Sequence, residues 1–259
     1  MGRKTIDRTG ETRINNFGSE MVIVEYRNSI DINVYFPSYD WTEKNRKYDE
    51  FKKGIIKCPY EKRYYNIGYL GSGNYKVSEN GKHTKVYNAW CSMLQRCYDS
   101  KFHKRQPTYM NCEICKEWHN FQNFGSWYNE NYYEIEGEKM CLDKDILVKG
   151  NKIYSPDTCI FVPNAINMLF VKCNKSRGDN LIGTNLYKGK YRVQCRVLNP
   201  ETRKSENKYL GCYATEQKAF EVYKQFKEKN IKEVADYYKN KIPTKLYDAL
   251  YNYEVEITD

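Results

Sequence analysis

Residues 190–197 read KYRVQCRV, so apolar or aromatic side chains alternate with cationic or amide side chains along the whole segment. A period of two places the two kinds on opposite faces of a β-strand. The set that would face a core is Tyr191, Val193, Cys195 and Val197. The set that would face away is Lys190, Arg192, Gln194 and Arg196. This alternation favours a sheet with one buried face and one basic face.

The neighbouring residues complete such a unit. Strand-like segments at 183–187, 190–197 and 208–213 predict a three-stranded antiparallel sheet. A helix is expected at 215–229, with Thr215 as its N-cap, followed by a helical region at 231–253 that Pro243 interrupts. The C-terminal part is therefore predicted to be a sheet packed on a helix.

Charge is concentrated in the same part of the chain. The net charge of +10 is the balance of +3 in residues 1–75, +1 in 76–171, +10 in 172–245 and −4 in 246–259. A concentrated basic surface attracts phosphate backbones, although a solvated lysine-rich surface without a partner has the same composition. Outward Arg and Gln side chains on a strand add a more specific indication, since Arg reads guanine and Gln reads adenine.

The order of motifs in this segment resembles the Apetala-two/ethylene-response-factor DNA-binding domain. The resemblance is carried by Gly183-Thr184, KYRVQCR at 190–196, and YLGCYATEQKA at 209–219. It implies double-stranded DNA as partner. The positions that would face DNA, by the resemblance and by the alternation, are Asn185, Tyr187, Lys190, Arg192, Gln194, Arg196 and Tyr209. Asn185, Tyr187, Gln194 and Tyr209 depart from the residues usual in that family, so no preferred DNA sequence follows.

The whole chain is predicted to be α+β with three modules. Residues 1–75 form a small β-rich module that includes a hairpin at 20–36, and residues 76–171 form a central module with helices at 85–98 and 117–132. Residues 139–171 read as strand, loop, strand and helix, with the helix opening at Pro163. Residues 172–259 form the sheet-and-helix module with C-terminal helices.

The 139–171 segment resembles an HNH or His-Me-finger endonuclease, a ββα-metal module. The resemblance rests on LDKDI at 142–146, Asn151, TCIFV at 158–162 and Asn167. It implies Mg²⁺ or a similar divalent metal that stabilises the scissile phosphate. The metal-ligand candidates are Asp143, Asp145 and Asn167, with Asn151 as a residue that fixes the loop.

Lys144 stands where the resemblance expects the general-base histidine. Lysine is a poor base at neutral pH unless its pKa is lowered by burial, because its ordinary value is ~10.4. Three alternatives stay open: Lys144 is such a base or a phosphate clamp, His119 reaches the site instead, or the site is inactive. The candidate catalytic residues are Lys144, Asp143, Asp145 and His119.

Cys112 and Cys115 form a single CxxC pair, which is one half of a structural zinc site. Cys97 and His119 would complete a Zn²⁺ site, and Cys141 or Cys159 are alternatives. The other interpretation is packed free thiols, which suits a reducing compartment.

No apolar run approaches the ~20 residues of a membrane span, and no apolar leader follows Met1. We therefore expect neither a membrane protein nor a secreted one. Lys, Asn and Tyr are abundant while Ala is scarce, with 31, 25, 26 and 6 residues, a bias typical of A/T-rich genes.

Taken together, the order of segments resembles phage-encoded HNH homing-type endonucleases that carry an Apetala-two domain. The resemblance implies a DNA-binding endonuclease in the cytoplasm of a bacterial host. Two alternatives stay open: a catalytically inactive DNA-binding regulator, and a host-takeover or anti-defence factor. The oligomeric state does not follow from the sequence.

Overall fold

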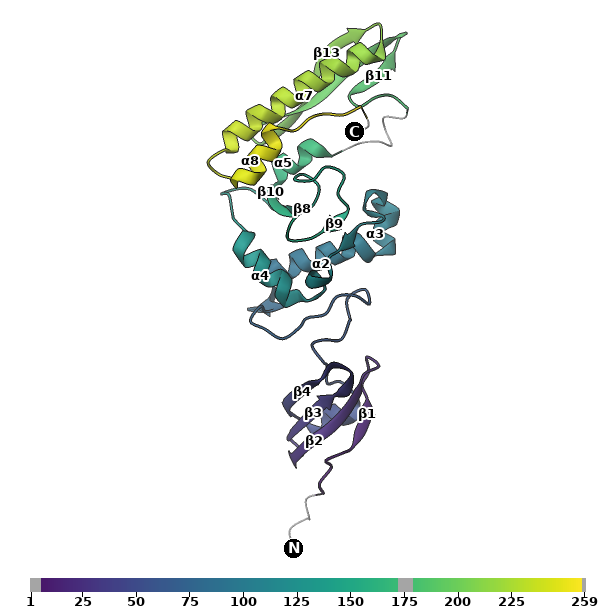
Figure 1. Cartoon of the computed structure of the whole chain (residues 1–259), viewed down its shortest axis with the longest axis vertical. Coiled ribbons are helices and arrows are strands. Elements are labelled where there is room, and N and C mark those ends of the chain that lie inside the picture. The colour runs from purple at the N-terminus through teal and green to yellow at the C-terminus, as the bar shows by residue number, and fades with distance from the viewer. Residues whose placement is uncertain (1–5, 172–178, 258–259) are drawn as a thin grey trace. The chain divides into compact units, whose positions relative to one another are not determined.

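The computed structural model describes residues 6–171 and 179–257, and its chain divides into two compact units, residues Met1–Glu130 and Asn131–Asp259. Both units combine helices with antiparallel sheets, so the predicted α+β class is confirmed (Figure 1). The three predicted modules are a finer division, and their boundaries stay predictions. No helix in the described ranges is both long and apolar enough to cross a lipid bilayer.

The first unit begins with a four-stranded antiparallel sheet in the order β1-β2-β3-β4. Its elements are β1 Thr12–Ile14, β2 Glu20–Asn28, β3 Asp31–Phe36, η1 Pro37–Tyr39, β4 Trp41–Arg46 and α1 Tyr48–Lys53. The hairpin predicted at 20–36 is β2 and β3. Apolar residues of alternate strand positions, of α1 and of the segment that follows α1 form the core: Met21, Ile23, Ile32, Val34, Phe36, Phe51, Ile56 and Cys58.

The rest of the first unit is mainly helical. Its elements are β5 Ser78–Glu79, β6 Lys82–His83, α2 Lys85–Tyr98, α3 Ser100–Arg105, η2 Pro107–Tyr109, β7 Glu113–Ile114, η3 Lys116–His119 and α4 Phe121–Asn131. The helix predicted at 85–98 is α2, and its apolar positions Trp90 and Leu94 are fully buried. Thr84 caps α2 by accepting a hydrogen bond from the Tyr87 amide.

The single helix predicted at 117–132 is wrong at its start, because the segment is divided into η3 and α4. Asn120 between them has extended backbone and pairs with Tyr69, whose amide donates to the His119 carbonyl. This pairing uses backbone groups that a continuous helix would need.

The second unit opens with β8 Met140–Asp143, β9 Ile153–Tyr154, β10 Ile160–Pro163, α5 Asn164–Asn167 and η4 Met168–Phe170. Strands β8 and β10 are antiparallel, with Asp143 opposite Ile160. The helix α5 follows β10 directly, with Pro163 as its N-cap. The predicted order of strand, loop, strand and helix is therefore present.

The three-stranded sheet predicted near the C-terminus is confirmed, in the order β11-β12-β13. Its strands are β11 Thr184–Tyr187, β12 Lys190–Asn199 and β13 Lys204–Tyr213, followed by α7 Glu216–Tyr238 and α8 Thr244–Tyr251. Thr215 is the N-cap of α7, as predicted, and accepts a hydrogen bond from the Lys218 amide. Helix α7 packs against the sheet (Figure 1).

Helix α7 continues through Asn230, so the predicted end at residue 229 is wrong. The Asn230 side chain is buried and spans to β12, where it accepts from the Leu198 amide and donates to the Leu198 carbonyl. Asparagine usually weakens a helix interior because its side chain can bond the backbone of its own helix. Here the Asn230 side chain bonds the backbone of β12 instead, so α7 stays intact.

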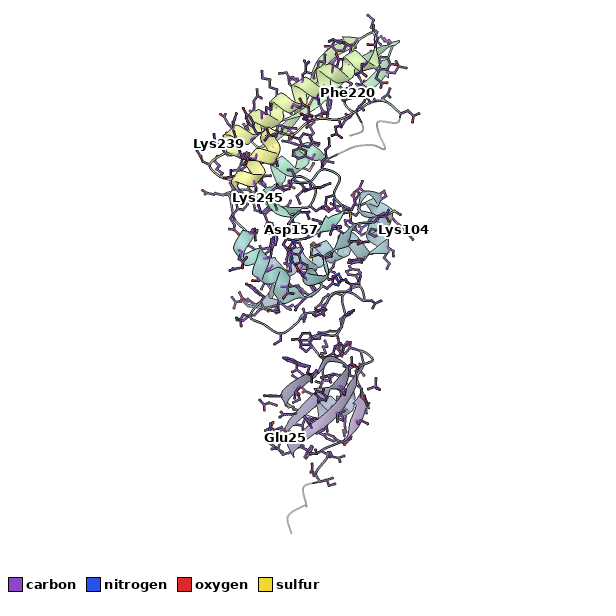
Figure 2. The ribbon with its side chains drawn as sticks, viewed as in Figure 1. Glu25, Lys104, Asp157, Phe220, Lys239 and Lys245 are labelled. Carbon is purple, nitrogen blue, oxygen red and sulfur yellow. The ribbon has the colours of Figure 1, made fainter. Side chains whose placement is uncertain are left out.

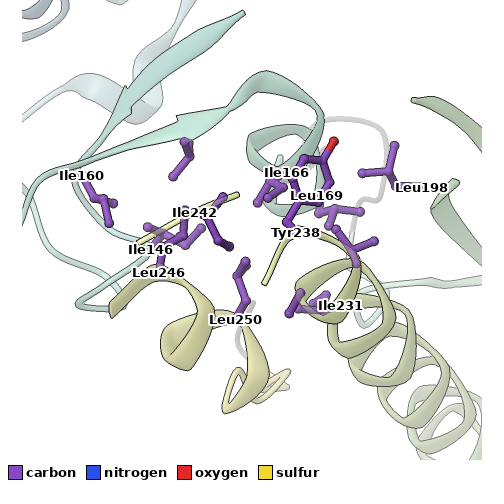
Figure 3. Packing of buried hydrophobic residues seen from close by; sticks show 13 residues of the cluster. Ile146, Ile160, Ile166, Leu169, Leu198, Ile231, Tyr238, Ile242, Leu246 and Leu250 are labelled. Atoms are coloured by element: carbon purple, nitrogen blue, oxygen red, sulfur yellow. The ribbon is translucent and has the colours of Figure 1, made fainter. Parts of the chain in front are cut away.

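One hydrophobic cluster joins both parts of the second unit (Figure 3). Its buried members are Ile146, Ile160, Val162, Ile166, Leu169, Leu198, Ile231, Val234, Ala235, Tyr238, Ile242, Leu246 and Leu250. The cluster takes residues from both sides of the predicted boundary at residue 171. The C-terminal half of α7 therefore packs on the β8–α5 segment, while its N-terminal half packs on the sheet.

Candidate nucleic-acid interface

The seven side chains predicted to face DNA lie on one face of the β11-β12-β13 sheet. Strand register places Asn185 beside Arg192, Tyr187 beside Lys190, and Gln194 beside Tyr209. Arg196 follows on the same face, opposite Asn207. Arg192 and Asn185 are half-buried, whereas Tyr187 and Tyr209 are exposed by 46% and 59%. Whether this face binds DNA stays a prediction.

Neighbouring side chains on this face support one another. Arg192 Nε donates to Asn185 Oδ1 at 3.1 Å, and its guanidinium carbon lies 5.0 Å from the centre of the Tyr187 ring. The Tyr209 hydroxyl donates to Cys212 Sγ at 3.4 Å. These contacts hold Arg192 near the middle of the sheet, which lowers the entropy lost when it binds a partner.

The opposite face of the sheet is buried under α7. Val193 and Cys195 of β12 are fully buried and pack with Ala219, Phe220 and Tyr223 of the helix. Gly183, which has positive φ, lets the Tyr223 ring approach the start of β11 so closely that a side chain there would overlap the ring. The sheet is therefore anchored on one face and open on the other.

The basic charge belongs to the strands and not to the helix. Residues 184–213 carry a net charge of +5, whereas residues 216–238 of α7 carry five basic and five acidic side chains. Residues 239–245, which run from the end of α7 into the first turn of α8, add +3, and Figure 2 labels Lys239 and Lys245 there. A phosphate backbone would therefore be attracted to the sheet more than to the exposed face of α7.

Lys227 is a buried cation in the layer between α7 and the sheet, which the sequence pattern did not single out. Its ammonium lies 3.5 Å from the Arg196 carbonyl oxygen. Burial lowers the pKa of Lys227, since the charged form loses its hydration there. The period of α7 places this position on the inner face, and that period was the available signal.

The Asp143–Asn151 loop holds the residues predicted for catalysis and metal binding. Asp143 Oδ1 accepts hydrogen bonds from the amides of Asp145 at 2.9 Å and Ile146 at 2.7 Å. Lys144 is buried, and its ammonium donates to the Asn151 carbonyl at 3.1 Å and lies 3.4 Å from Asp145 Oδ2. These contacts join residues of the loop to one another and fix its conformation.

Asn151 has the loop-fixing role that the resemblance assigned to it. Its Nδ2 donates to the carbonyls of Lys144 at 2.6 Å and Ile153 at 2.7 Å, and its Oδ1 accepts from the Ile153 amide at 3.1 Å. Lys144 and Asn151 therefore exchange hydrogen bonds, each side chain with the backbone of the other. The ammonium of Lys144 has a structural partner and is not presented as an open general base.

The chemistry of this loop suits a hard cation only in part. Burial and the nearby Asp145 carboxylate raise the pKa of Asp143. One oxygen of each aspartate stays outside these hydrogen bonds, and carboxylates are ligands that Mg²⁺ accepts. The Lys144 ammonium already compensates Asp145, however, so a divalent ion would compete with it. Within the described residues, no hydrogen bond or ion pair joins Asn167 to either aspartate.

The remaining site predictions fall in the first unit. His119 Nε2 lies 3.1 Å from the Ile114 carbonyl oxygen, and burial lowers the pKa of its ring. Cys97 and Cys112 are buried, and Cys115 is half-buried. In the part of the chain that the structure describes, no three His, Cys, Asp or Glu side chains are grouped as a metal site. Zinc binding and a catalytic role for His119 stay predictions.

Comparison with known proteins gives no significant match: no family model, no curated protein and no solved structure corresponds to this chain. The resemblances to Apetala-two domains and HNH endonucleases therefore stay predictions.

Proposed function

We propose that this protein binds double-stranded DNA through the outer face of the β11-β12-β13 sheet. One observation carries the proposal: cationic, amide and phenol side chains share a single sheet face, and the opposite face is packed on α7. The helix is charge-balanced, whereas Lys190, Arg192 and Arg196 place three cations on that one surface.

The chemistry of β12 suits contact with base edges. Arg192, Gln194 and Arg196 are spaced by two residues, which is about 6.6 Å along a strand. A small sheet can enter the major groove, where Arg pairs with guanine and Gln with adenine. Tyr187 and Tyr209 flank β12 and have hydroxyl groups that can donate to phosphates.

The test compares two triple variants in a duplex-binding assay. Arg192→Ala/Gln194→Ala/Arg196→Ala removes two cations and one amide from the sheet. Lys218→Ala/Gln225→Ala/Lys229→Ala removes the same groups from exposed positions of α7. At about 1–3 kcal/mol for each good side-chain pair with a base, the sheet variant should bind duplex DNA at least about 100-fold more weakly.

The control variant should bind like the wild type. Equal losses in both variants would show that only bulk charge matters, and no loss in the sheet variant would exclude this face as the DNA-binding surface.

A metal-dependent endonuclease of the homing type is the second candidate. The observation that favours it is the arrangement of β8, β10 and α5, with Asp143 and Asp145 where β8 ends. In this candidate the sheet positions the protein on DNA, and the aspartates with Asn167 hold Mg²⁺ or a similar ion. The hydrogen bonds of Lys144 favour instead the non-catalytic alternatives, a DNA-binding regulator or a host-takeover or anti-defence factor.

A nicking assay separates these alternatives. Supercoiled plasmid is incubated with Mg²⁺ or Mn²⁺ and the wild type, Asp143→Asn/Asp145→Asn, or the control Asp157→Asn, which changes an exposed carboxylate. The double variant retains the Oδ1 acceptor of Asp143, so the loop should stay folded. Nicking by the wild type and the control alone would support the endonuclease, and no nicking by any of them would leave DNA binding without cleavage.

The proposal includes the location expected from the sequence, the cytoplasm of a phage-infected bacterial cell. What supports it is the composition typical of A/T-rich genes and the reduced thiols of the cysteines in the described residues, which suit a reducing compartment.

A further inference from the structure

An exposed aromatic ring stands at the turn between β1 and β2 in the first unit. Phe17 is 44% exposed, although phenylalanine is among the side chains most often buried. A single exposed ring is ordinary by itself. Three features of its surroundings make this one different: the way the turn is held, the cations beside the ring, and the charge of the segment that supplies them.

The turn is built around one buried amide. Asn15 is 4% exposed, and its Oδ1 accepts from the amides of Phe17 at 3.0 Å and Ser19 at 2.8 Å. Its Nδ2 donates to the Ile56 carbonyl at 3.0 Å and to Glu61 Oε1. Every polar atom of this side chain is used, so the backbone that presents Phe17 is held in one conformation.

Two cations lie over the ring. The Lys57 ammonium is 5.1 Å from the centre of the Phe17 ring, and the Arg63 guanidinium carbon is 5.5 Å away. Arg63 Nε lies 3.8 Å from Oε2 of Glu61, a residue that is 3% exposed. Glu61 Oε2 has no hydrogen-bond partner. Its negative charge therefore attracts the nearby Arg63 guanidinium and favours its position over the ring.

The two cations come from a positively charged segment, whereas the preceding part of the β-sheet region is negatively charged. Residues 51–63 carry a net charge of +4, whereas residues 6–50 carry −3. Two of the basic residues of this segment, Lys57 and Arg63, are the ones that contact the exposed ring. This concentration favours an anionic partner.

We propose that the Phe17–Lys57–Arg63 surface binds an unpaired DNA strand. A base stacks on the Phe17 ring, and the phosphates on either side of it contact Lys57 and Arg63. Stacking on an aromatic side chain combined with cations along the backbone is how proteins hold single strands without sequence preference. An acidic peptide would use the cations but has no planar group matched to the ring.

This surface extends the proposed DNA binding from the sheet of the second unit to the first unit and to a different form of DNA. The two proposals rest on different residues and can fail separately. If both hold, one chain contacts DNA at two places, and the second contact gains from the effective concentration that the first provides.

The test measures binding of fluorescein-labelled oligothymidylate by anisotropy with the full-length protein. Phe17→Leu retains an apolar side chain but removes the aromatic face, whereas Phe17→Tyr retains it. We expect about a 10-fold loss of single-strand affinity for Phe17→Leu, and affinity within about twofold of the wild type for Phe17→Tyr. Ile30→Ala, at an apolar residue 69% exposed in the β2–β3 turn, is the control and should change nothing.

Lys57→Ala should also weaken single-strand binding and reduce its salt dependence, compared with Lys44→Ala on β4 as the charge-matched control. The sheet variant of Arg192, Gln194 and Arg196 should lose duplex binding and retain single-strand binding. The proposal is overturned if Phe17→Leu binds oligothymidylate like the wild type, or if only the sheet variant loses it. Unchanged melting temperatures will show that these exposed substitutions leave the fold intact.

Discussion

The outer face of the sheet and the Asp143–Asn151 loop contain similar side chains that the fold uses differently. On the sheet, Lys190, Gln194 and Arg196 are exposed, and β12 is held by its backbone ladder and its buried face. In the loop, Lys144 and Asn151 each bond the backbone of the other. The charged groups of the sheet are available to a partner, and those of the loop support the fold.

The difference follows from backbone geometry. The amides and carbonyls of a strand form hydrogen bonds with the neighbouring strands, so its outward side chains are not needed as partners of the backbone. A tight loop lacks such neighbours, and Asp, Asn and Lys side chains become the partners of its backbone groups. A spacing of polar residues in a sequence is therefore stronger evidence for a binding face on a strand than for a catalytic site in a loop.

The largest expected effect in this comparison concerns stability. Lys144→Met retains the aliphatic stem but removes the ammonium, leaving the Asn151 carbonyl without that donor. We expect the free energy of unfolding to fall by about 2 kcal/mol. Arg196→Met, the matched change on the sheet, should alter it by less than about 0.5 kcal/mol. Chemical denaturation measures the free energy of unfolding of both variants. Equal losses would show that the Lys144 and Arg196 side chains contribute to stability in the same way.

A smaller effect concerns the cation beneath the sheet. Because the pKa of Lys227 is lowered in the folded state, the unfolded chain binds more protons between that pKa and the ordinary value of 10.5. The stability of the wild type relative to Lys227→Met should therefore rise with pH across this interval. The Cys195 thiol and the Arg196 guanidinium also influence the pKa of Lys227, and both are present in both proteins. Denaturation of both at several alkaline pH values checks this, and a constant difference would contradict it.

The smallest effect tests whether bound DNA covers the outer face of the sheet. Cys212 lies opposite Arg192 in the register, and it is the exposed cysteine among the described residues. Saturating duplex DNA should slow its alkylation by N-ethylmaleimide severalfold, as followed by mass mapping of the peptide that contains Cys212. In the Arg192→Ala/Gln194→Ala/Arg196→Ala variant, the same DNA concentration should give little protection. Full-rate labelling in the wild-type complex would place DNA elsewhere.

Patterns with a local cause were predictable from the sequence. The alternation in residues 190–197 marked β12 and the face to which each side chain points, and the apolar spacing of residues 85–98 marked α2. Thr215 marked the start of α7 because its hydroxyl can accept from the first turn. Each of these follows from side chains near one another along the chain.

Features that depend on distant partners were not predictable. Asn230 continues α7 because Leu198 supplies its hydrogen bonds, and Asn120 divides a helix because Tyr69 pairs with its backbone. The Phe17 turn depends on hydrogen bonds from Asn15 to Ile56 and Glu61, which are 41 and 46 residues away from Asn15. The candidate site shows the same division: the sheet face followed from periodicity, whereas the role of Lys144 depends on a loop whose path the sequence does not reveal.

The salt dependence of duplex binding tests the central claim most directly. We expect log K of the wild type to fall linearly with log of the salt concentration, with a slope of about −0.9 for each phosphate contacted. The sheet variant should show a shallower slope, and the α7 control variant should match the wild type. A flat response of the wild type, or the same slope in the sheet variant, would contradict DNA binding by this face.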